Sequence, residues 1–275
     1  MLAMAGLFFS IAASGIRIEC FSVRCCRNGE PGYTPLMKFL AAAILSASAA
    51  IAPLNAQAPD ANAILEGARL SATLVEMKEG IQGNLVQGRK KVPITIYLKG
   101  KDIQFQFYEG NVWRKFHMRL ADDKYDLFEI IDGKTRDFPR EKLIEPIAGT
   151  DLTYEDLALR FFYWPNPKLE GSEDVGGQKC FKLRLDKPNG AAGRYEGVYV
   201  WVHTKYGAFM RIRGHDSNGT LVKEFQVEDV MKVGDNVWVL EKMQVATHDP
   251  KNGRRISITD VTFSKPSKDA LKGLR

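Results

Sequence analysis

Cysteine is scarce in this sequence. Four of its 275 residues are cysteines, and three of them lie within the first 26 positions. Only Cys180 lies in the rest of the chain, which excludes a disulfide framework and a four-cysteine zinc site. Because Cys180 falls in a segment of alternating apolar residues, the sequence predicts a small core side chain with an unreactive thiol.

Motifs that carry chemistry are also missing. The glycines at 171, 176 and 177 lack the lysine that follows them in a phosphate-binding loop, and the Gly-x-Ser-x-Gly elbow of lipases is absent. The histidines are scattered without the spacing of a zinc site; they are His117, His203, His215 and His248. The sequence therefore predicts no catalytic residues, no metal site and no cofactor, and we expect a protein that is not an enzyme.

No strong charge of one sign is present, since 39 basic and 33 acidic residues are interspersed and give a net charge of +6. Such mixing is typical of a solvated surface and argues against nucleic acid as a partner. The composition, 45% hydrophobic and 26% charged, is that of a globular protein. After residue 58, no hydrophobic run approaches the ~18 residues needed to cross a bilayer.

The first 58 residues have the pattern of a leader. From Met37, one lysine, an apolar run and an Ala-x-Ala sequence ending at Ala58 predict a secretory signal peptide at 37–58, with cleavage after Ala58. Residues 1–36 are interpreted as an N-terminal extension that arises from a start codon assigned too early. We expect residues 59–275 to form a single domain, exported to the periplasm of a diderm bacterium.

Hydrophobic periodicity predicts the secondary structure. From Asp60 to Met77, apolar residues recur with the spacing of one helix face, which predicts an amphipathic helix capped by Asp60. From residue 92 the period changes to two, and turn signals such as Gly110-Asn111 and Asp132-Gly133 follow at intervals near ten residues. We therefore expect a mainly β fold with helices (α+β), built as an antiparallel meander of roughly ten or eleven strands.

A second helix is predicted from Thr150 to Trp164, where Thr153 and Asp156 form a capping box and Pro165 blocks continuation. Its apolar residues lie on both sides, so it requires cover on both faces. A helix buried against the sheet and a movable lid fit this pattern equally well. The lid candidates are Tyr154, Leu157, Phe161 and Trp164.

The predicted strands carry much apolar surface on one set of faces. A long antiparallel sheet curls and gains a concave face, and helices that cover this face incompletely would leave a cavity suited to acyl chains. Complete filling by side chains is the alternative, and periodicity does not choose between the two. The candidates for a lipid-binding cavity are Ile94, Ile96, Leu98, Ile103, Phe105, Phe107, Phe116, Met118, Val198, Val200, Val202, Met210, Ile212, Leu240, Met243 and Val245.

The string Gly-Thr-Asp-Leu-Thr-Tyr-Glu-Asp-Leu at 149–157 resembles the central signature of outer-membrane lipoprotein-sorting proteins of the LolA-like superfamily. Two preceding stretches, 137–140 and 143–147, fit the same pattern. The similarity continues through Leu169-Glu170-Gly171, 195–202, 215–223 and 258–261, so that it extends over residues 60–264.

This resemblance implies an unclosed antiparallel β-barrel of about eleven strands, with helices that plug its mouth and an interior that receives the acyl chains of lipoproteins. It also implies an arginine on the sheet that holds the helical lid closed. The candidates for this role are Arg89, Arg114 and Arg119, and the sequence does not choose among them.

From these features we expect a periplasmic carrier that binds the acyl chains of lipoproteins, or other lipids, for transport to the outer membrane. Its further partners would be an inner-membrane releasing complex and an outer-membrane acceptor. The alternative is an envelope-lipid sensor or scaffold module of the same fold that contacts a protein partner.

Overall fold

The computed structural model describes residues 8–10, 59–71, 77–121, 124–234 and 237–266. The predicted signal peptide at 37–58 and its cleavage site lie outside the described residues, as does all of 1–36 except the short strand β1 (Phe8–Ser10). Among the helices of the described part, none combines the length and apolar character that a membrane crossing requires.

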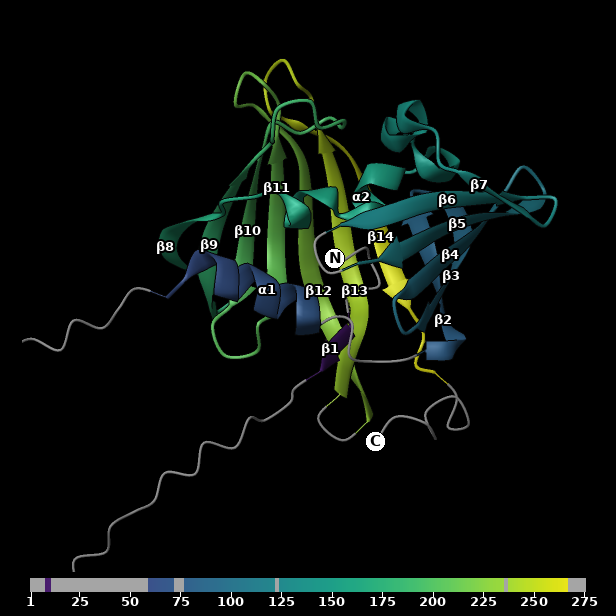
Figure 1. Ribbon diagram of the computed structural model, residues 1–275, viewed down its shortest axis with the longest axis horizontal. Coiled ribbons are helices and arrows are strands. Elements are labelled where there is room, and N and C mark those ends of the chain that lie inside the picture. Colours follow the sequence, from purple (N-terminus) through teal and green to yellow (C-terminus); the bar gives the residue numbers. More distant parts are fainter. Residues whose placement is uncertain (1–7, 11–58, 72–76, 122–123, 235–236, 267–275) are drawn as a thin grey trace, which may run out of the picture. The chain divides into compact units, whose positions relative to one another are not determined.

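One antiparallel sheet dominates the structure (Figure 1). Thirteen strands follow one another along it in the order β7-β6-β5-β4-β3-β2-β14-β13-β12-β11-β10-β9-β8, and β1 pairs with β13 beside this path. The strands of the path are β2 (Met77–Gln87), β3 (Lys90–Lys99), β4 (Asp102–Glu109), β5 (Val112–Leu120), β6 (Tyr125–Ile131), β7 (Lys134–Asp137), β8 (Lys168–Val175), β9 (Gln178–Asp186), β10 (Gly197–His203), β11 (Phe209–His215), β12 (Leu221–Gly234), β13 (Val237–His248) and β14 (Arg255–Phe263).

The expected mainly β class is confirmed, but about eleven strands is too few. Apolar alternation locates strands with one buried face, whereas β7 is exposed along its whole length and β8 along most of it. These two outermost strands are stabilised by pairing with a neighbour, which a pattern of buried residues does not reveal.

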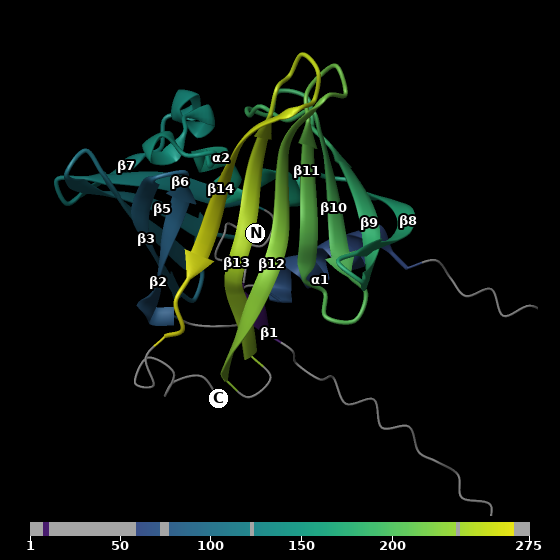
Figure 2. The same ribbon diagram turned by 180° about the vertical axis from the view of Figure 1, so that it is seen from behind.

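The sheet consists of two meanders that meet where β2 pairs with β14. Strands β2 to β7 form one meander and β8 to β14 the other, so β7 and β8 are the free edges and the sheet does not close. The connecting segment, residues 138–167, leads from one free edge to the other. Figures 1 and 2 show α1 (Ala61–Ser71) and α2 (Tyr154–Ala158) on one face of the sheet, called the inner face below.

Two of the predicted hairpin turns are present with the expected geometry. Glu109 pairs with Val112 across a two-residue loop in which Gly110 and Asn111 have φ values of 57° and 63°. Asp132 and Gly133 form the corresponding loop between β6 and β7, with φ of 50° and 74°. Two consecutive positive φ values match the right-handed twist of the flanking strands, and these residue types adopt them at low energetic cost.

The first helix is shorter than predicted. Asp60 caps α1 as expected, because its carboxylate accepts a hydrogen bond from the N–H of Asn62 at 3.1 Å. The described helix ends at Ser71, and Met77, predicted as its last residue, begins β2 and pairs with Leu98. Strand pairing therefore overrides the helical spacing at this end of the segment.

The second helix is interrupted. Thr153 and Asp156 form the predicted capping box, but α2 ends at Ala158 because Leu159 has the left-handed backbone conformation (φ 40°, ψ 46°). A 3-10 turn, Arg160–Tyr163, follows in a new direction. This change of direction explains the apolar residues on all sides of the predicted helix, because Leu157 and Phe162 can both lie in the core.

Candidate functional site

The inner face carries one continuous apolar cluster. Fifteen of the sixteen cavity candidates belong to it, all except Met210, and each is at most 1% exposed. Side chains with so little exposure have no water-sized space next to them. In this structure, neighbouring side chains therefore fill the space in front of the wall. The structure therefore places these candidates together on one wall and shows that wall covered.

The lid candidates cover part of this wall. Leu157, Phe161 and Trp164 are buried within the same cluster, and Tyr154 packs against it from the side. The Tyr154 ring lies 5.4 Å from that of Phe116, measured between centroids. The connecting segment is therefore in direct contact with the predicted lipid-binding wall.

Met210 was predicted on this wall and lies on the opposite face. Trp201 pairs with Arg211 and Val202 pairs with Phe209, so Met210 is an extra residue in β11 without a partner in β10. Such a bulge reverses the alternation of side chains. Phe209 consequently joins the inner cluster, and Met210 packs with Trp201 in a small cluster on the outer face.

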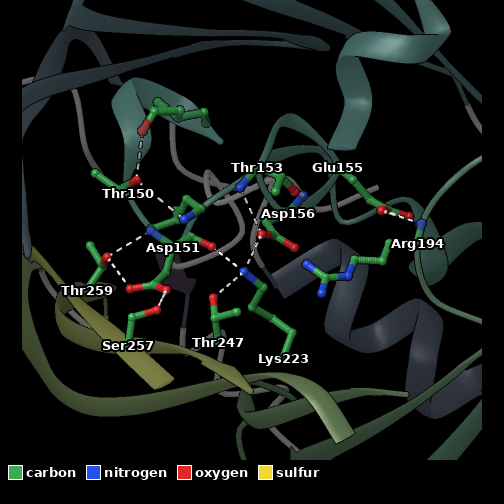
Figure 3. A network of polar contacts seen from close by, with 12 residues as sticks. Thr150, Asp151, Thr153, Glu155, Asp156, Arg194, Lys223, Thr247, Ser257 and Thr259 are labelled. Atoms are coloured by element: carbon green, nitrogen blue, oxygen red, sulfur yellow. Dashed lines mark hydrogen bonds and ion pairs between the residues drawn. The ribbon is translucent and has the colours of Figure 1, made fainter. Parts of the chain in front are cut away.

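The signature segment, residues 149–157, is bound to the inner face by buried polar contacts (Figure 3). Asp151 is the anchor to β14 and β2: its Oδ2 accepts hydrogen bonds from the Thr259 hydroxyl at 2.8 Å and from the Gln87 amide at 2.9 Å. Its Oδ1 accepts a third from the Ser257 hydroxyl, and its N–H donates to Thr259 Oγ1 at 3.0 Å. These bonds fix the start of the segment over the junction of the two meanders.

Lys223 of β12 holds the next residues of the signature segment. Its Nζ donates to the backbone carbonyl of Asp151 and to the Thr247 hydroxyl, the latter at 3.0 Å, and lies 3.7 Å from Asp156 Oδ2. Asp156 also accepts a hydrogen bond from the Tyr195 hydroxyl, and its side chain is fully buried. A buried cation and a buried carboxylate thus connect the sheet to α2.

Glu155 is a second buried carboxyl group, on the other side of α2. Burial is the main cause that raises its pKa, to about 7, and the nearby Asp156 adds to the increase. The hydrogen bond from the Arg194 N–H, 2.8 Å long, and the charges of Arg160 and Lys187 act in the opposite direction. The side chain therefore changes protonation near neutral pH, at the contact between α2 and the β9–β10 loop.

Residues with a left-handed backbone conformation lie on both sides of α2. Ala148, with φ 48° and ψ 29°, precedes the signature segment, and Leu159 ends the helix. L-residues with a side chain adopt this conformation only at an energetic cost, and such residues concentrate where a segment moves or binds. The Lys90 ammonium donates a hydrogen bond to the carbonyl of Ala148 and so holds the first of these joints against the β2–β3 hairpin.

Of the three gating candidates, Arg114 lies near the connecting segment: it lines a pocket together with Glu145 and Tyr154, and its charge acts to lower the pKa of Tyr154. Arg114 and Arg119 pair with the carboxylates of Glu109 and Asp102, at 3.8 Å and 3.0 Å, and Arg89 is exposed in the turn between β2 and β3. Among the described residues, the cations of the sheet that donate hydrogen bonds to the segment are two lysines, Lys90 and Lys223.

Sequence reasoning missed Lys223, although a signal was present. Lys223, Phe225 and Val227 alternate along β12, and the latter two belong to the inner cluster. A charged residue at an inward-facing position of an apolar strand needs a buried partner. The partner could not be identified from the sequence because Asp156 lies 67 positions away, on a different element.

No group of three or more metal-ligating side chains occurs in the described residues. Three of the four histidines have other partners: His117, His203 and His248 contact Asp102, Gln178 and the Gly253 carbonyl respectively. Cys180 is buried, and burial raises the pKa of its thiol to about 11, which disfavours the reactive thiolate.

Comparison with known proteins gives a family and a fold. A family model described as "Uncharacterized protein" matches residues 117–271, more than half of the chain. No curated protein matches the sequence. Among solved structures, a DUF1329 family protein from Desulfovibrio piger has a TM-score of 0.55 and 19% sequence identity, over 74% of this chain and 91% of that one.

Two further solved structures are similar over 78% of this chain. A structure named as a domain of an outer membrane lipoprotein-sorting protein, from Vibrio parahaemolyticus, has a TM-score of 0.56 and 14% identity over 98% of its own length. A LolA superfamily protein from Nitrosomonas europaea has a TM-score of 0.53 and 15% identity over 97% of its length. At these identities the likeness establishes a LolA-like fold, as the signature segment predicted.

Proposed function

This chain belongs to the family whose model matches residues 117–271, and from its LolA-like fold we propose that it is a lipid or lipoprotein carrier of the bacterial envelope. The single observation that carries the proposal is the continuous apolar cluster on the inner face, covered by α1 and the connecting segment rather than by a second sheet. The name of the similar Vibrio domain, a lipoprotein-sorting protein, agrees with it.

The acyl chain would bind where the connecting segment now packs. Each methylene group that leaves water contributes ~0.8 kcal/mol, so a sixteen-carbon chain offers on the order of 10 kcal/mol before ordering costs. This is of the same order as the burial of the large apolar side chains of the connecting segment, which contribute about 1.5–3 kcal/mol each. The segment acts as the plug in this proposal: it covers the wall in the empty carrier and moves aside when a chain enters.

The contacts of the signature segment suit such a movement. Besides the contacts of its apolar side chains, the segment is attached through the polar groups of Asp151, Lys223 and Glu155, which water can satisfy once the segment has moved. The strained joints at Ala148 and Leu159 lie on both sides of the part that would move. The proposal is of a binding protein without catalysis.

We further propose export to the periplasm through the predicted signal peptide at 37–58. There the carrier would receive a lipoprotein or lipid from an inner-membrane releasing complex and deliver it to an outer-membrane acceptor.

Lipid binding can be tested on protein purified from its own envelope. Native mass spectrometry is expected to find one bound lipid or lipoprotein, and a fatty acid with a nitroxide quencher on its chain should then bind saturably to the delipidated protein. A stable protein complex that contains no lipid would favour the sensor or scaffold function instead. Absence of both bound lipid and saturable uptake contradicts the carrier.

Tryptophan fluorescence can locate the bound chain. Trp164 lies buried in the connecting segment, whereas Trp201 lies on the outer face. Nitroxide quenching requires near contact, so Trp164→Phe should remove most of the quenching and Trp201→Phe should leave it unchanged. If Trp201→Phe removed the quenching and Trp164→Phe did not, the acyl chain would lie on the outer face.

A further inference from the structure

A pocket of about 770 Å³ lies between the β6–β7 edge and the end of the connecting segment. Its walls come from β6, the end of β7, the turn at 140–144, the turn at 160–163 and the β9–β10 loop, so both meanders contribute to it. We call it the seam pocket. Its size is within the range of small-molecule sites, ~300–1,000 Å³.

One wall of the seam pocket is aromatic. Tyr125 and Tyr163 lie with their ring centroids 4.8 Å apart, and Phe138 and Trp164 extend the wall. Trp164 and Tyr163 also contact the main apolar cluster. The wall therefore continues into the interior of the proposed carrier and gives an acyl chain an apolar path to it.

Three cationic side chains also line the seam pocket. Arg160 donates hydrogen bonds from Nε to the Tyr125 hydroxyl and from Nη1 to the carbonyl of Ala192, at 3.3 Å for the latter. A guanidinium has five N–H groups, so three remain for a ligand. Lys124 and Arg140 line the same pocket, and within the described part of the chain none of the three cations forms an ion pair.

Two carboxylates, Asp126 and Asp137, also line the pocket, and both are exposed. The hydrogen bonds of Arg160 are different, because both acceptors are neutral oxygens, one on β6 and one in the β9–β10 loop, while its charge also acts on the buried carboxyl group of Glu155. In the same wall, the hydroxyl group of Tyr163 is buried and has no hydrogen-bond partner. A buried donor without a partner is unfavourable, and a ligand oxygen would satisfy it after a small ring movement.

We propose that the seam pocket binds the anionic head group of a membrane lipid, a phosphate or a carboxylate, while the acyl chain follows the aromatic wall inward. Arg160 is the main contact of the head group, and Arg140 and Lys124 attract it electrostatically. The inference rests on the proposed carrier function and adds a preference for anionic lipids to it.

The test compares two ligands with the same tail on the full chain, dodecyl phosphate and dodecyl maltoside, both below the concentration at which they form micelles. Dodecyl phosphate is expected to bind about tenfold more tightly, because a charge-assisted contact to an arginine contributes this much. Arg160→Gln should remove most of that preference and leave the affinity for dodecyl maltoside unchanged. Inorganic phosphate alone should bind far more weakly than dodecyl phosphate.

Two further variants separate binding from folding. Arg140→Gln changes an exposed side chain, so it should reduce the preference severalfold without changing thermal stability. Arg136→Gln is the matched control: it is exposed on β7 outside the pocket and should change nothing. Equal affinity for the two dodecyl ligands overturns the head-group site and leaves the carrier intact, whereas binding of neither overturns the carrier. Phosphate that binds as tightly as dodecyl phosphate would show a site for a free anion and overturn the lipid assignment.

Discussion

The Lys223 ammonium lies 3.7 Å from Oδ2 of Asp156, and both side chains are at most 2% exposed. Lys223 belongs to the sheet and Asp156 to the helix that covers it. Removal of one partner of a buried ion pair leaves an uncompensated charge, which is far less favourable than removal of both. The pair therefore makes this contact between opposite charges one of the attachments that hold the connecting segment on the sheet.

Lys223→Met is expected to lower the free energy of unfolding by about 3–5 kcal/mol, the usual range for a broken buried pair. The double variant with Asp156→Asn leaves no charge unpaired. It should therefore lower the free energy of unfolding by clearly less than the sum of the decreases in the two single variants. Urea denaturation of the unaltered protein, the two single variants and the double variant measures this coupling. Lys232→Met, an exposed lysine on the same strand, is the control; additive effects of the pair would contradict the coupling.

Glu155 should make the protein less stable as the pH rises towards neutrality. Its pKa is about 7 in the folded chain, against 4.5 for an ordinary glutamate, so the folded state holds the proton more tightly. The stabilisation is complete below pH 4.5 and is lost as the pH rises to 7, by roughly 3 kcal/mol.

The comparison is between unfolding free energies at pH 5 and pH 8. Glu155→Gln resembles the protonated side chain and should remove most of the decrease seen in the unaltered protein, whereas Glu141→Gln, an exposed change in the same segment, should keep it. An unchanged pH dependence in Glu155→Gln would mean that this carboxyl group is not the cause.

Ala148→Gly should stabilise the closed segment. The left-handed conformation costs an L-residue about 1–2 kcal/mol, while the extra freedom of glycine in the unfolded chain costs about 0.5–1 kcal/mol, so a net gain of up to ~1 kcal/mol is expected. For a domain of this size, this gain raises Tm by roughly 2–4 °C.

Ala158→Gly is the matched control for the strained joint, because Ala158 lies in α2 and glycine disfavours a helix. It should lower Tm. If the joint is a hinge, Ala148→Gly should also slow the uptake of the nitroxide-labelled fatty acid. A decrease of Tm in Ala148→Gly would show that Ala148 is not strained.

Truncation of two neighbouring apolar residues in β11 tests the bulge. Ile212→Ala removes a side chain of the main cluster and should cost about 2–5 kcal/mol. Met210→Ala removes a half-buried side chain on the outer face and should cost clearly less. Only Ile212→Ala should alter binding of an acyl chain, and an equal effect of both variants on binding would place Met210 on the inner wall after all.

The strands and hairpins follow from local chemistry. Alternation of apolar and polar residues over 92–120, together with Gly110-Asn111 and Asp132-Gly133 in two-residue loops, is sufficient for an antiparallel meander. The capping box of Thr153 and Asp156 is equally local and is present. The edge strands and the interruption at Leu159 are different, because they depend on what packs beside them.

The sequence predicted which apolar residues form the candidate site, but it did not predict whether other side chains cover them. The sequence identified the apolar residues of the wall, and the structure gathers all but Met210 into one cluster. Whether that wall is open or covered depends on how the connecting segment returns across the sheet. The bulge at Met210 is also non-local, since it is defined by the register between β10 and β11.

The sequence by itself determined the class of the fold, the turns and the signature segment, because each depends on residues close together in the chain. Only the tertiary structure decided that Lys223 faces Asp156, that Arg160 reaches both sides of the seam, and that side chains fill the inner wall. These contacts join elements far apart in the sequence, and their geometry is set by strand register and by the path of the connecting segment, which no local pattern encodes.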